Sequence, residues 1–207
     1  MNPFDFFEFI VCINLYRRKD RWEESKREFE SIGILDRVLR FSAIEHENPC
    51  IGNHLSHARI LELANYNGYT NVLIFEDDVN FFPNALENLT KSLNDIPSNW
   101  DMIYLGANLD CYPAHKFTSH LARLTGAFST HAYGINSSLF DLLIKINKDT
   151  NTTHNDVTYA NEIHPNYNCF LTIPLVAGQR DSYSDIQKKV MKSNPVFVER
   201  LRNNLVE

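Results

Sequence analysis

The sequence is poor in glycine and proline, and its cysteines show no paired spacing. Seven glycines and eight prolines among 207 residues are too few for a long flexible linker, and no internal repeat or low-complexity segment is present. The four cysteines lie far apart, which favours buried free thiols over a disulfide framework or a zinc site. No hydrophobic run approaches the length of a membrane span. These absences predict one globular domain.

Positive charge is also in short supply, since the formal net charge is −6. Such a chain lacks the cationic field that general affinity for nucleic acid or anionic membrane requires. Segment 17–21 (RRKDR) is a local exception that suits a small anionic ligand, or is the solvated start of a helix. The N-terminal residues have no basic leader and no small-residue cleavage site. We therefore expect a cytoplasmic protein, which is compatible with a peripheral association with a membrane.

Apolar strands and amphipathic helices alternate through the first two thirds of the chain. Strands are expected at 9–15, 38–41, 72–75, 101–105, 127–135 and 169–173, and helices at 18–32, 54–67, 137–146 and from Pro83 onward. The end of the chain, from about residue 183, is expected to be partly helical. The alternation favours an α/β fold with a mostly parallel central sheet flanked by helices. Ligands of such sheets bind beyond the carboxyl ends of the strands.

Three consecutive carboxylates, Glu76, Asp77 and Asp78, follow the strand expected at 72–75. They repel one another unless they are solvated or neutralised. One interpretation is a solvated turn, and the other is a site for Mg²⁺ or Mn²⁺, which take hard oxygen ligands together with substrate phosphates. On an extended chain Glu76 and Asp78 point the same way and would hold the metal. Asp77 would point to the other side and reach a sugar or ribose hydroxyl.

Polar side chains also follow the first expected strand. Asn14, Arg17, Arg18 and Arg21 lie at its end and at the start of the next helix. Guanidinium groups and a helix N-terminus both favour an anion, and Asn14 is suited to read a base edge. The alternative is that Asp20 pairs with a neighbouring arginine on a solvated surface.

Five segments in order resemble glycosyltransferase family 25, which includes lipooligosaccharide galactosyltransferases and the galactosyltransferase domains of collagen-modifying enzymes. They are INLYRRKDRW (13–22), GNHLSHARIL (52–61), VLIFEDDV (72–79), WDMIYLG (100–106) and STHAYGI (129–135). A looser similarity continues in PLVAGQRDSYSDI (174–186). The chain departs from the family at Gly52-Asn53, where the family usually has Gly-Cys, and it is short for such a domain.

The resemblance implies a GT-A-like single domain over residues 1–207. Its nucleotide-binding part would span about 9–110, its acceptor side about 111–186, and a tail 187–207. The implied activity is the inverting transfer of galactose or glucose from a UDP-sugar, with Mn²⁺ or Mg²⁺. The acceptor would be a hydroxyl of a glycan, a lipid-linked saccharide or a hydroxylated protein.

The resemblance also assigns residues by position. Glu76 and Asp78 would bind the metal. The donor would be bound by Asn14, Leu15, Arg18, Arg21, His57, Asp77, His131 and Gln179. A lone histidine beside an apolar run is more often structural, whereas His131 or His154 is a candidate third metal ligand. Among the aromatic residues, Tyr16 is the candidate to stack on uracil, and Trp22, Trp100 and Tyr104 are expected in the core.

An inverting transfer also needs a base that takes the proton of the acceptor hydroxyl. The candidates are Asp156, Asp181 and Asp110. We favour Asp156 as the catalytic residue because the polar stretch 150–161 is typical of an active-site loop. Asp156 is equally well explained as a helix N-cap.

Two other function classes stay open. One is a catalytically silent GT-A-like module that binds a nucleotide-sugar or a glycan without transferring it. The other is a metal-dependent nucleotidyltransferase or phosphohydrolase, which ranks last because the chain has no P-loop.

Overall fold

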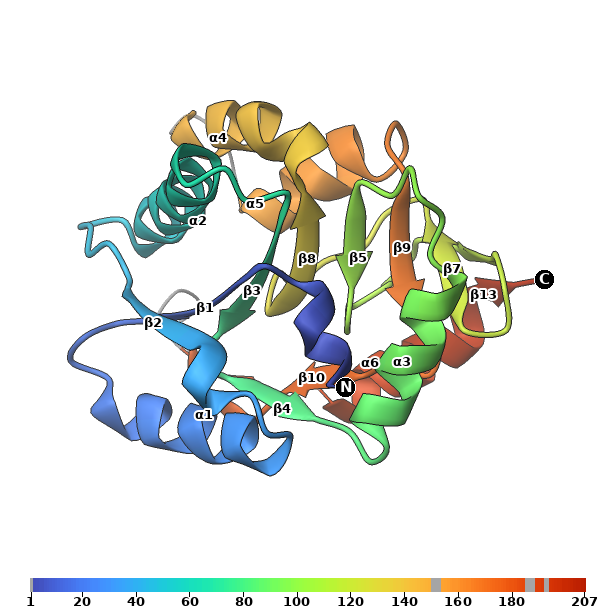
Figure 1. Cartoon of the computed structure of the whole chain (residues 1–207), viewed down its shortest axis with the longest axis horizontal. Coiled ribbons are helices and arrows are strands. Elements are labelled where there is room, and N and C mark those ends of the chain that lie inside the picture. The colour runs from blue at the N-terminus through green and yellow to red at the C-terminus, as the bar shows by residue number, and fades with distance from the viewer. Residues whose placement is uncertain (1, 150–153, 185–188, 192–193) are drawn as a thin grey trace.

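The computed structural model describes residues 2–149, 154–184, 189–191 and 194–207. A mixed nine-stranded sheet in the order β13-β6-β7-β9-β5-β8-β3-β1-β2 runs through the molecule (Figure 1). Its strands are β1 (Phe9–Asn14), β2 (Val38–Ser42), β3 (Asn71–Glu76), β5 (Met102–Tyr104), β6 (Ala114–Lys116), β7 (Leu121–Leu124), β8 (Ala132–Asn136), β9 (Cys169–Thr172) and β13 (Leu205–Val206). Strands β7 and β8 run opposite to the others, so most strands are parallel in direction.

Helices and two short ribbons complete the fold. The helices are α1 (Lys19–Ser31), α2 (Pro49–Tyr66), α3 (Ala85–Asp95), α4 (Phe140–Lys148), α5 (Asn155–Thr158) and α6 (Asn194–Asn204), with 3-10 turns η1 (Pro3–Phe6), η2 (Leu35–Arg37) and η3 (Ser137–Leu139) and a π-helical turn η4 (Tyr159–Ile163). The antiparallel ribbons are β4 (Val79–Phe81) with β10 (Ala177–Gln179), and β11 (Ser182–Ser184) with β12 (Lys189–Met191). No helix in the described ranges is long and apolar enough to cross a membrane.

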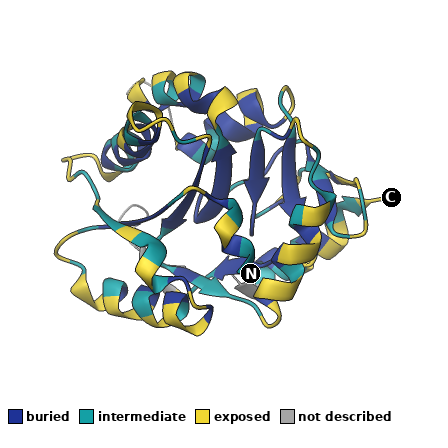
Figure 2. Cartoon of the chain, in the orientation of Figure 1, coloured by how far each residue is buried: buried dark blue, intermediate teal, exposed yellow. Residues whose placement is uncertain are grey.

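The hydrophobic core is divided by the sheet into two clusters, and Figure 2 shows the central strands buried with helices exposed on their outer sides. Alternation along β1 sends Val11 and Ile13 into one cluster and Ile10 and Cys12 into the other. The first cluster contains apolar side chains of α2, α4 and α6, and the second those of α1 and α3. The α/β architecture with helices on both faces of a sheet is therefore confirmed.

Element boundaries agree with local sequence signals. Helix α1 ends just before Gly33, whose φ of 71° is a conformation that glycine adopts readily. Helix α2 begins at Pro49, earlier than the expected residue 54, because Asn48 caps it by accepting a hydrogen bond from the Cys50 amide at 3.0 Å.

Other expectations were less accurate. The strand expected at 127–135 is shorter, since β8 begins at Ala132. The short strands β4, β6, β7, β10 and β13 were not expected, because two to four residues carry too little alternation to be recognised. The four cysteines, all within the described ranges, form no disulfide, and Cys12 and Cys169 are buried as expected, whereas Cys50 is half-buried and Cys111 is exposed.

Gly106 provides a test of the packing at the end of β5. A Cβ atom there would lie 1.8 Å from the Ala177 carbonyl oxygen, which belongs to the β10 backbone. We expect Gly106→Ala to lower the free energy of unfolding by about 3 kcal/mol, because backbone must move. Gly68→Ala, which meets open space but has a φ of 72°, should cost only about 1 kcal/mol. Urea denaturation measures both, and equal losses would contradict the close approach of β10.

Candidate functional site

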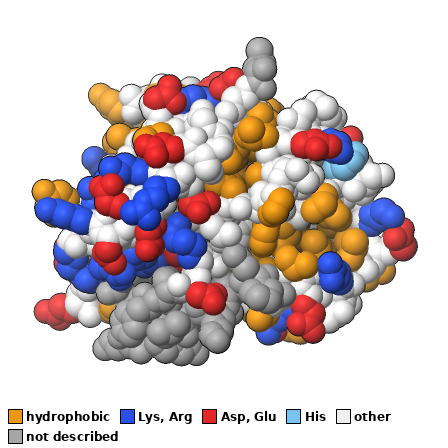
Figure 3. Space-filling view, turned by 90° about the horizontal axis from the view of Figure 1, so that it is seen from below, with side chains coloured by type: hydrophobic (Ala, Val, Ile, Leu, Met, Phe, Trp, Pro, Cys, Tyr) orange, Lys and Arg blue, Asp and Glu red, His pale blue; other side chains and the backbone are white. Residues whose placement is uncertain are grey.

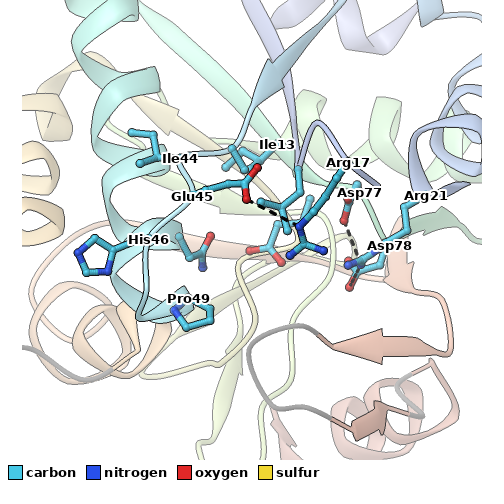
Figure 4. A pocket seen from close by; sticks show the side chains of 13 residues that line it. Ile13, Arg17, Arg21, Ile44, Glu45, His46, Pro49, Asp77 and Asp78 are labelled. Atoms are coloured by element: carbon cyan, nitrogen blue, oxygen red, sulfur yellow. Dashed lines mark ion pairs between the residues drawn. The ribbon is translucent and has the colours of Figure 1, made fainter. Parts of the chain in front are cut away.

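A cavity of about 210 Å³ opens at the carboxyl ends of β1, β2 and β3. Its lining comes from the ends of β1 and β3, the segments after these three strands, the first turn of α1 and the first part of α2. The lining residues are Ile13, Leu15, Arg17, Arg21, Ala43, Ile44, Glu45, His46, Pro49, Asn53, Glu76, Asp77 and Asp78. Figure 4 shows Asp77 and Asp78 beside Arg21 at one end and His46 and Pro49 at the other. The three acidic residues therefore face a cavity at the sheet edge where ligands of α/β proteins bind.

Arg21 is the cation that holds two of the acids together. Its Nη2 atom lies 3.0 Å from Asp77 Oδ1 and 2.9 Å from Asp78 Oδ2. The Arg21 and Asp77 side chains are largely buried, so their attraction is weakly screened by solvent. The Asn14 amide donates a hydrogen bond to Asp77 Oδ2 at 2.5 Å. These contacts tie the first turn of α1 and the end of β1 to the residues that follow β3.

Glu76 has different partners. Thr130 Oγ1 donates a hydrogen bond to Glu76 Oε1 at 2.9 Å, and His57 Nε2 lies 3.6 Å from the same oxygen. Burial acts to raise the pKa of Glu76, but the interactions with His57 and Thr130 outweigh it and leave the pKa below its usual value. The His57 ring is itself held through Nδ1, 2.8 Å from the Tyr133 hydroxyl. Glu76 is therefore the acid that stays ionised most readily.

Asp78 is in the opposite electrostatic position. Burial and the negative charges of Glu76 and Asp77 outweigh the attraction of Arg21 and raise the pKa of Asp78 to about 6. Burial also raises the pKa of Asp77, although Arg21 and Asn14 act to lower it. The three acids of the cluster thus have one arginine, Arg21, that pairs with two of their carboxylates, and burial raises the pKa of both of these acids.

The carboxylates do not alternate along an extended strand as expected. The extended chain ends at Glu76, and Asp77 and Asp78 form the turn between β3 and β4. As a result, Asp78 shares Arg21 with Asp77, and all three acids line the cavity. The expected division, with Asp77 on the opposite side from Glu76 and Asp78, is therefore wrong.

Three residues near the end of β1 that were expected to bind the nucleotide-sugar, Asn14, Leu15 and Arg18, lie in different environments. Asn14 is buried, and besides Asp77 its amide contacts Arg40, whose Nη2 donates to Asn14 Oδ1 at 2.6 Å. Leu15 lines the cavity. Arg18 lies outside the lining and forms an ion pair of 2.9 Å with Asp20, as the alternative interpretation held. A hydrogen bond from Arg18 lowers the pKa of Asp20 to about 2.

His131 and Gln179 lie beside the carboxylate cluster rather than in the cavity lining. His131 is fully buried, and burial lowers its pKa to about 4 although the Glu76 charge opposes this shift. Neither ring nitrogen makes a hydrogen bond of good geometry, although the Ala177 backbone lies close enough to favour protonation. Gln179 Nε2 donates to Asp78 Oδ1 at 3.5 Å. Both residues therefore lie where they can influence the acids, and their donor-binding roles stay predictions.

Asp156 lies in the first turn of α5 and outside the cavity lining. Its Oδ2 accepts a hydrogen bond from the Ser129 amide at 3.0 Å, and Ser129 has a φ of 74°. The N-cap position belongs to His154, so the interpretation of Asp156 as the cap is wrong. Ser129 precedes Thr130, the residue that binds Glu76. Asp156 is thus linked to the acidic cluster through two consecutive residues.

The other two base candidates and the candidate metal ligand His154 lie outside the cavity lining. Asp110 forms an ion pair of 2.9 Å with Arg200. Asp181 is exposed and follows β10. His154 is exposed, with Nδ1 3.5 Å from Cys50 Sγ.

The aromatic residues agree with most expectations. Trp100 and Tyr104 are buried, and Trp22 is partly buried against the second core cluster. Tyr16 is 65% exposed beside two lining residues, so it is available to a ligand, and the Arg40 guanidinium carbon lies 5.7 Å from its ring centroid.

Several residues of the site were missed by the sequence interpretation. Glu45, which forms a 3.8 Å ion pair with Arg17, and His46 line the cavity just beyond the end of β2. The rule that parallel strands present ligand-binding residues at their carboxyl ends applies to β2 as well as to β1 and β3, and it would have identified this loop. Thr130 and Arg40 carry no such signal, because their roles depend on tertiary contacts.

The acidic cluster fits a divalent cation in its chemistry. Carboxylate oxygens are the ligands that Mg²⁺ and Mn²⁺ prefer, and Glu76, Asp77 and Asp78 all line the cavity. No group of three or more His, Cys, Asp or Glu side chains is arranged as a metal cluster in the described part of the chain. A cation that shares its coordination with substrate phosphates needs only one or two protein carboxylates. Glu76 and Asp78 are the residues that would hold it.

Known proteins resemble this chain in sequence and in fold. "Putative glycosyltransferase R655" of Acanthamoeba polyphaga mimivirus is 28% identical over 146 residues, which cover 60% of this chain and 45% of that protein. The human protein "Inactive glycosyltransferase 25 family member 3" is 33% identical over 129 residues, or 48% of this chain and 22% of that protein. The chain thus spans less than half the length of these relatives. No family model matches.

Two solved structures share the fold. One is a glycosyltransferase involved in the glycosylation of the major capsid of PBCV-1, with a TM-score of 0.52 and 12% identity over 79% of this chain and 80% of that one. The other is A197 from STIV, with a TM-score of 0.51 and 12% identity over 90% of this chain and 94% of that one. The chain has a GT-A-like glycosyltransferase fold. Its sequence is similar to glycosyltransferase family 25, so the resemblance seen in the five motifs is confirmed.

The raised pKa of Asp78 predicts how the stability of the protein depends on pH. Its pKa of about 6 in the folded chain exceeds the usual 3.8, so the stability from Asp78 is complete below pH 3.8 and is lost as the pH rises through 6. Asp78→Asn, which cannot ionise, should therefore unfold with a free energy roughly 1–2 kcal/mol higher than wild type at pH 7.5. The difference should vanish near pH 4.

Chemical denaturation across this pH range measures the effect. Asp20→Asn is the matched control, because the pKa of Asp20 is lowered to about 2 and its neutralisation should not stabilise the protein at neutral pH. Destabilisation by Asp78→Asn at pH 7.5 would contradict the raised pKa of Asp78 in the folded chain.

Proposed function

We propose that this chain is a metal-dependent inverting glycosyltransferase that moves a hexose, galactose or glucose, from a UDP-sugar to a hydroxyl of a glycan or protein. The main observation behind this proposal is one cavity at the carboxyl ends of three parallel strands. It is lined by the acids Glu76, Asp77 and Asp78 and by Arg17 and Arg21. Carboxylates for a cation beside guanidinium groups for phosphate suit a nucleotide diphosphate. The GT-A-like fold and the similarity to a putative glycosyltransferase support the same class of reaction.

The two ends of the cavity suit different parts of a nucleotide-sugar. The end near Ile44 and Pro49 lies away from Arg21, Asp77 and Asp78 and would accept the base. Arg17 and Arg21 would bind the diphosphate as bidentate donors. Glu76 and Asp78 would hold the cation. When bound, Mn²⁺ or Mg²⁺ supplies Lewis-acid stabilisation of the leaving diphosphate.

Asp156 would accept the proton of the acceptor hydroxyl. Its link to Glu76 through Ser129 and Thr130 supports a position on the acceptor side of the same site. A general base at this point contributes about 10²–10⁴-fold to the rate. His57 and Thr130 would keep Glu76 ionised for the cation, since their contacts lower its pKa.

The release of UDP tests the proposed activity. We expect slow, metal-dependent release from one UDP-sugar without acceptor, and loss of this release with EDTA. Asp78→Ala should reduce it on the order of 100-fold, because a carboxylate that holds the cation is removed. Asp20→Ala, which removes an exposed acid outside the cavity lining, should leave the rate within twofold. Equal rates with Mn²⁺ and with EDTA would contradict the metal dependence.

Asp156→Asn tests the assignment of the base. The asparagine Oδ1 can still accept the hydrogen bond from the Ser129 amide, so we expect the fold to be retained. Transfer to an acceptor should fall by about 10²–10⁴-fold while UDP-sugar affinity, measured by calorimetry, stays unchanged. Transfer at the wild-type rate would remove Asp156 from this role.

A second candidate function is a silent module that binds a nucleotide-sugar or glycan. Two observations favour it, since Arg21 already pairs with Asp77 and Asp78, and Asp156 lies outside the cavity lining. One of the curated relatives is also named as inactive. Binding of a UDP-sugar without UDP release, in the presence of candidate acceptors, would favour this function over transfer.

A further inference from the structure

Arg180, in the segment after β10, contacts the backbone that carries two of the acids. Its amide donates to the Asp78 carbonyl at 2.7 Å. Its side chain donates through Nη2 to the Asp77 carbonyl at 2.6 Å and through Nη1 to the Val79 carbonyl at 2.5 Å. The carbonyls of three consecutive residues therefore all accept hydrogen bonds from one arginine, although about 100 residues of sequence separate the two segments.

The position of Arg180 is fixed from two directions. The antiparallel pairing of β10 with β4 places Gln179 opposite Val79, which brings the next residue against the turn. From the other side, helix α1 contributes Glu24, whose Oε2 lies 3.4 Å from Arg180 Nε. Ser25, also in α1, is fully buried with its Oγ 2.9 Å from the Asp77 carbonyl and 3.5 Å from Arg180 Nη2. The guanidinium thus has little freedom to turn away.

A turn that carries adjacent acids needs such support. The side chains of Asp77 and Asp78 both line the cavity beside Glu76, and the three negative charges repel one another. The repulsion is relieved if the turn moves and separates the carboxylates, which would disperse the ligands of a cation. Hydrogen bonds from Arg180 to the carbonyls oppose this movement, and its charge acts against the repulsion. Figure 3 shows acidic and basic side chains interspersed over one side of the molecule.

We propose that Arg180 is a positioning residue that fixes the 77–79 turn so that the Asp77 and Asp78 carboxylates face the nucleotide-binding cavity. The inference deepens the proposed function and rests on it. Arg180 lies outside the cavity lining and acts through the backbone of the turn. A lysine would keep the charge but could not reach the Asp77 and Val79 carbonyls together, because that contact uses two nitrogens of a planar fork.

Arg180→Lys is the direct test, and Arg123→Lys is its matched control. Arg123 also binds backbone, since its Nη2 donates to the Tyr167 carbonyl at 2.8 Å, but it lies on β7 and outside the cavity lining. Two readouts are measured for both variants and wild type. The first is amide hydrogen exchange in peptides covering 76–82, compared with the rest of the chain. The second is the affinity for Mn²⁺ together with UDP, by electron paramagnetic resonance and calorimetry.

We expect Arg180→Lys to accelerate exchange at least tenfold in 76–82 and to weaken Mn²⁺-dependent UDP binding by about 10–100-fold. Arg123→Lys should change the exchange in 76–82 and the UDP affinity by no more than about twofold, even if it lowers the melting temperature as much as Arg180→Lys does. Unchanged exchange and affinity in Arg180→Lys, or equal effects of both variants, would overturn the role of Arg180. A wild-type chain that binds neither Mn²⁺ nor UDP would overturn the proposed function instead. Exchange in 76–82 distinguishes the two failures, because it reports on the turn without any ligand.

Discussion

The ion pair of Arg21 with Asp77 and Asp78 is the interaction on which the site depends. It joins the first turn of α1 to the turn after β3, and it lies in a largely buried place where an unpaired charge would be costly. Asn14 at the end of β1 completes the junction through Asp77. The ends of two neighbouring parallel strands and the first turn of α1 are therefore joined through Asp77, and the cavity lies beside it.

The three acids are chemically unequal, although they are adjacent in sequence. His57 and Thr130 keep the pKa of Glu76 low, whereas burial and its acidic neighbours raise the pKa of Asp78 to about 6. A cluster of this kind is short of positive charge, and a cation with a diphosphate would supply both the missing charge and a ligand for the nearby arginines. Arg21 would then pair with phosphate as well as with Asp77. The same charge deficit explains why the turn needs support from a distant arginine.

Features of the site that depend on neighbouring residues in the sequence could be predicted, whereas those that depend on contacts between distant segments could not. The apolar run before Glu76 and the position of Arg21 at a helix start were enough to predict that acids and an arginine meet at one edge of the sheet. The alternation of Glu76, Asp77 and Asp78 was wrong, because a turn begins where an extended strand was assumed. Arg180 could not be recognised as a partner of this turn, because β10 has only three residues and pairs with a strand about 100 residues away. The resemblance to family 25 was carried by short motifs, and it is confirmed by relatives that share only part of their length.

Anomalous diffraction from a crystal grown with Mn²⁺ and UDP would test the central claim most directly. We expect a manganese peak in the cavity, in contact with carboxylate oxygens of Glu76 or Asp78, with Arg21 contacting the diphosphate. UDP bound in the cavity with no manganese at the acids, and with Arg21 still paired to both Asp77 and Asp78, would contradict the claim that this cluster is a cation site.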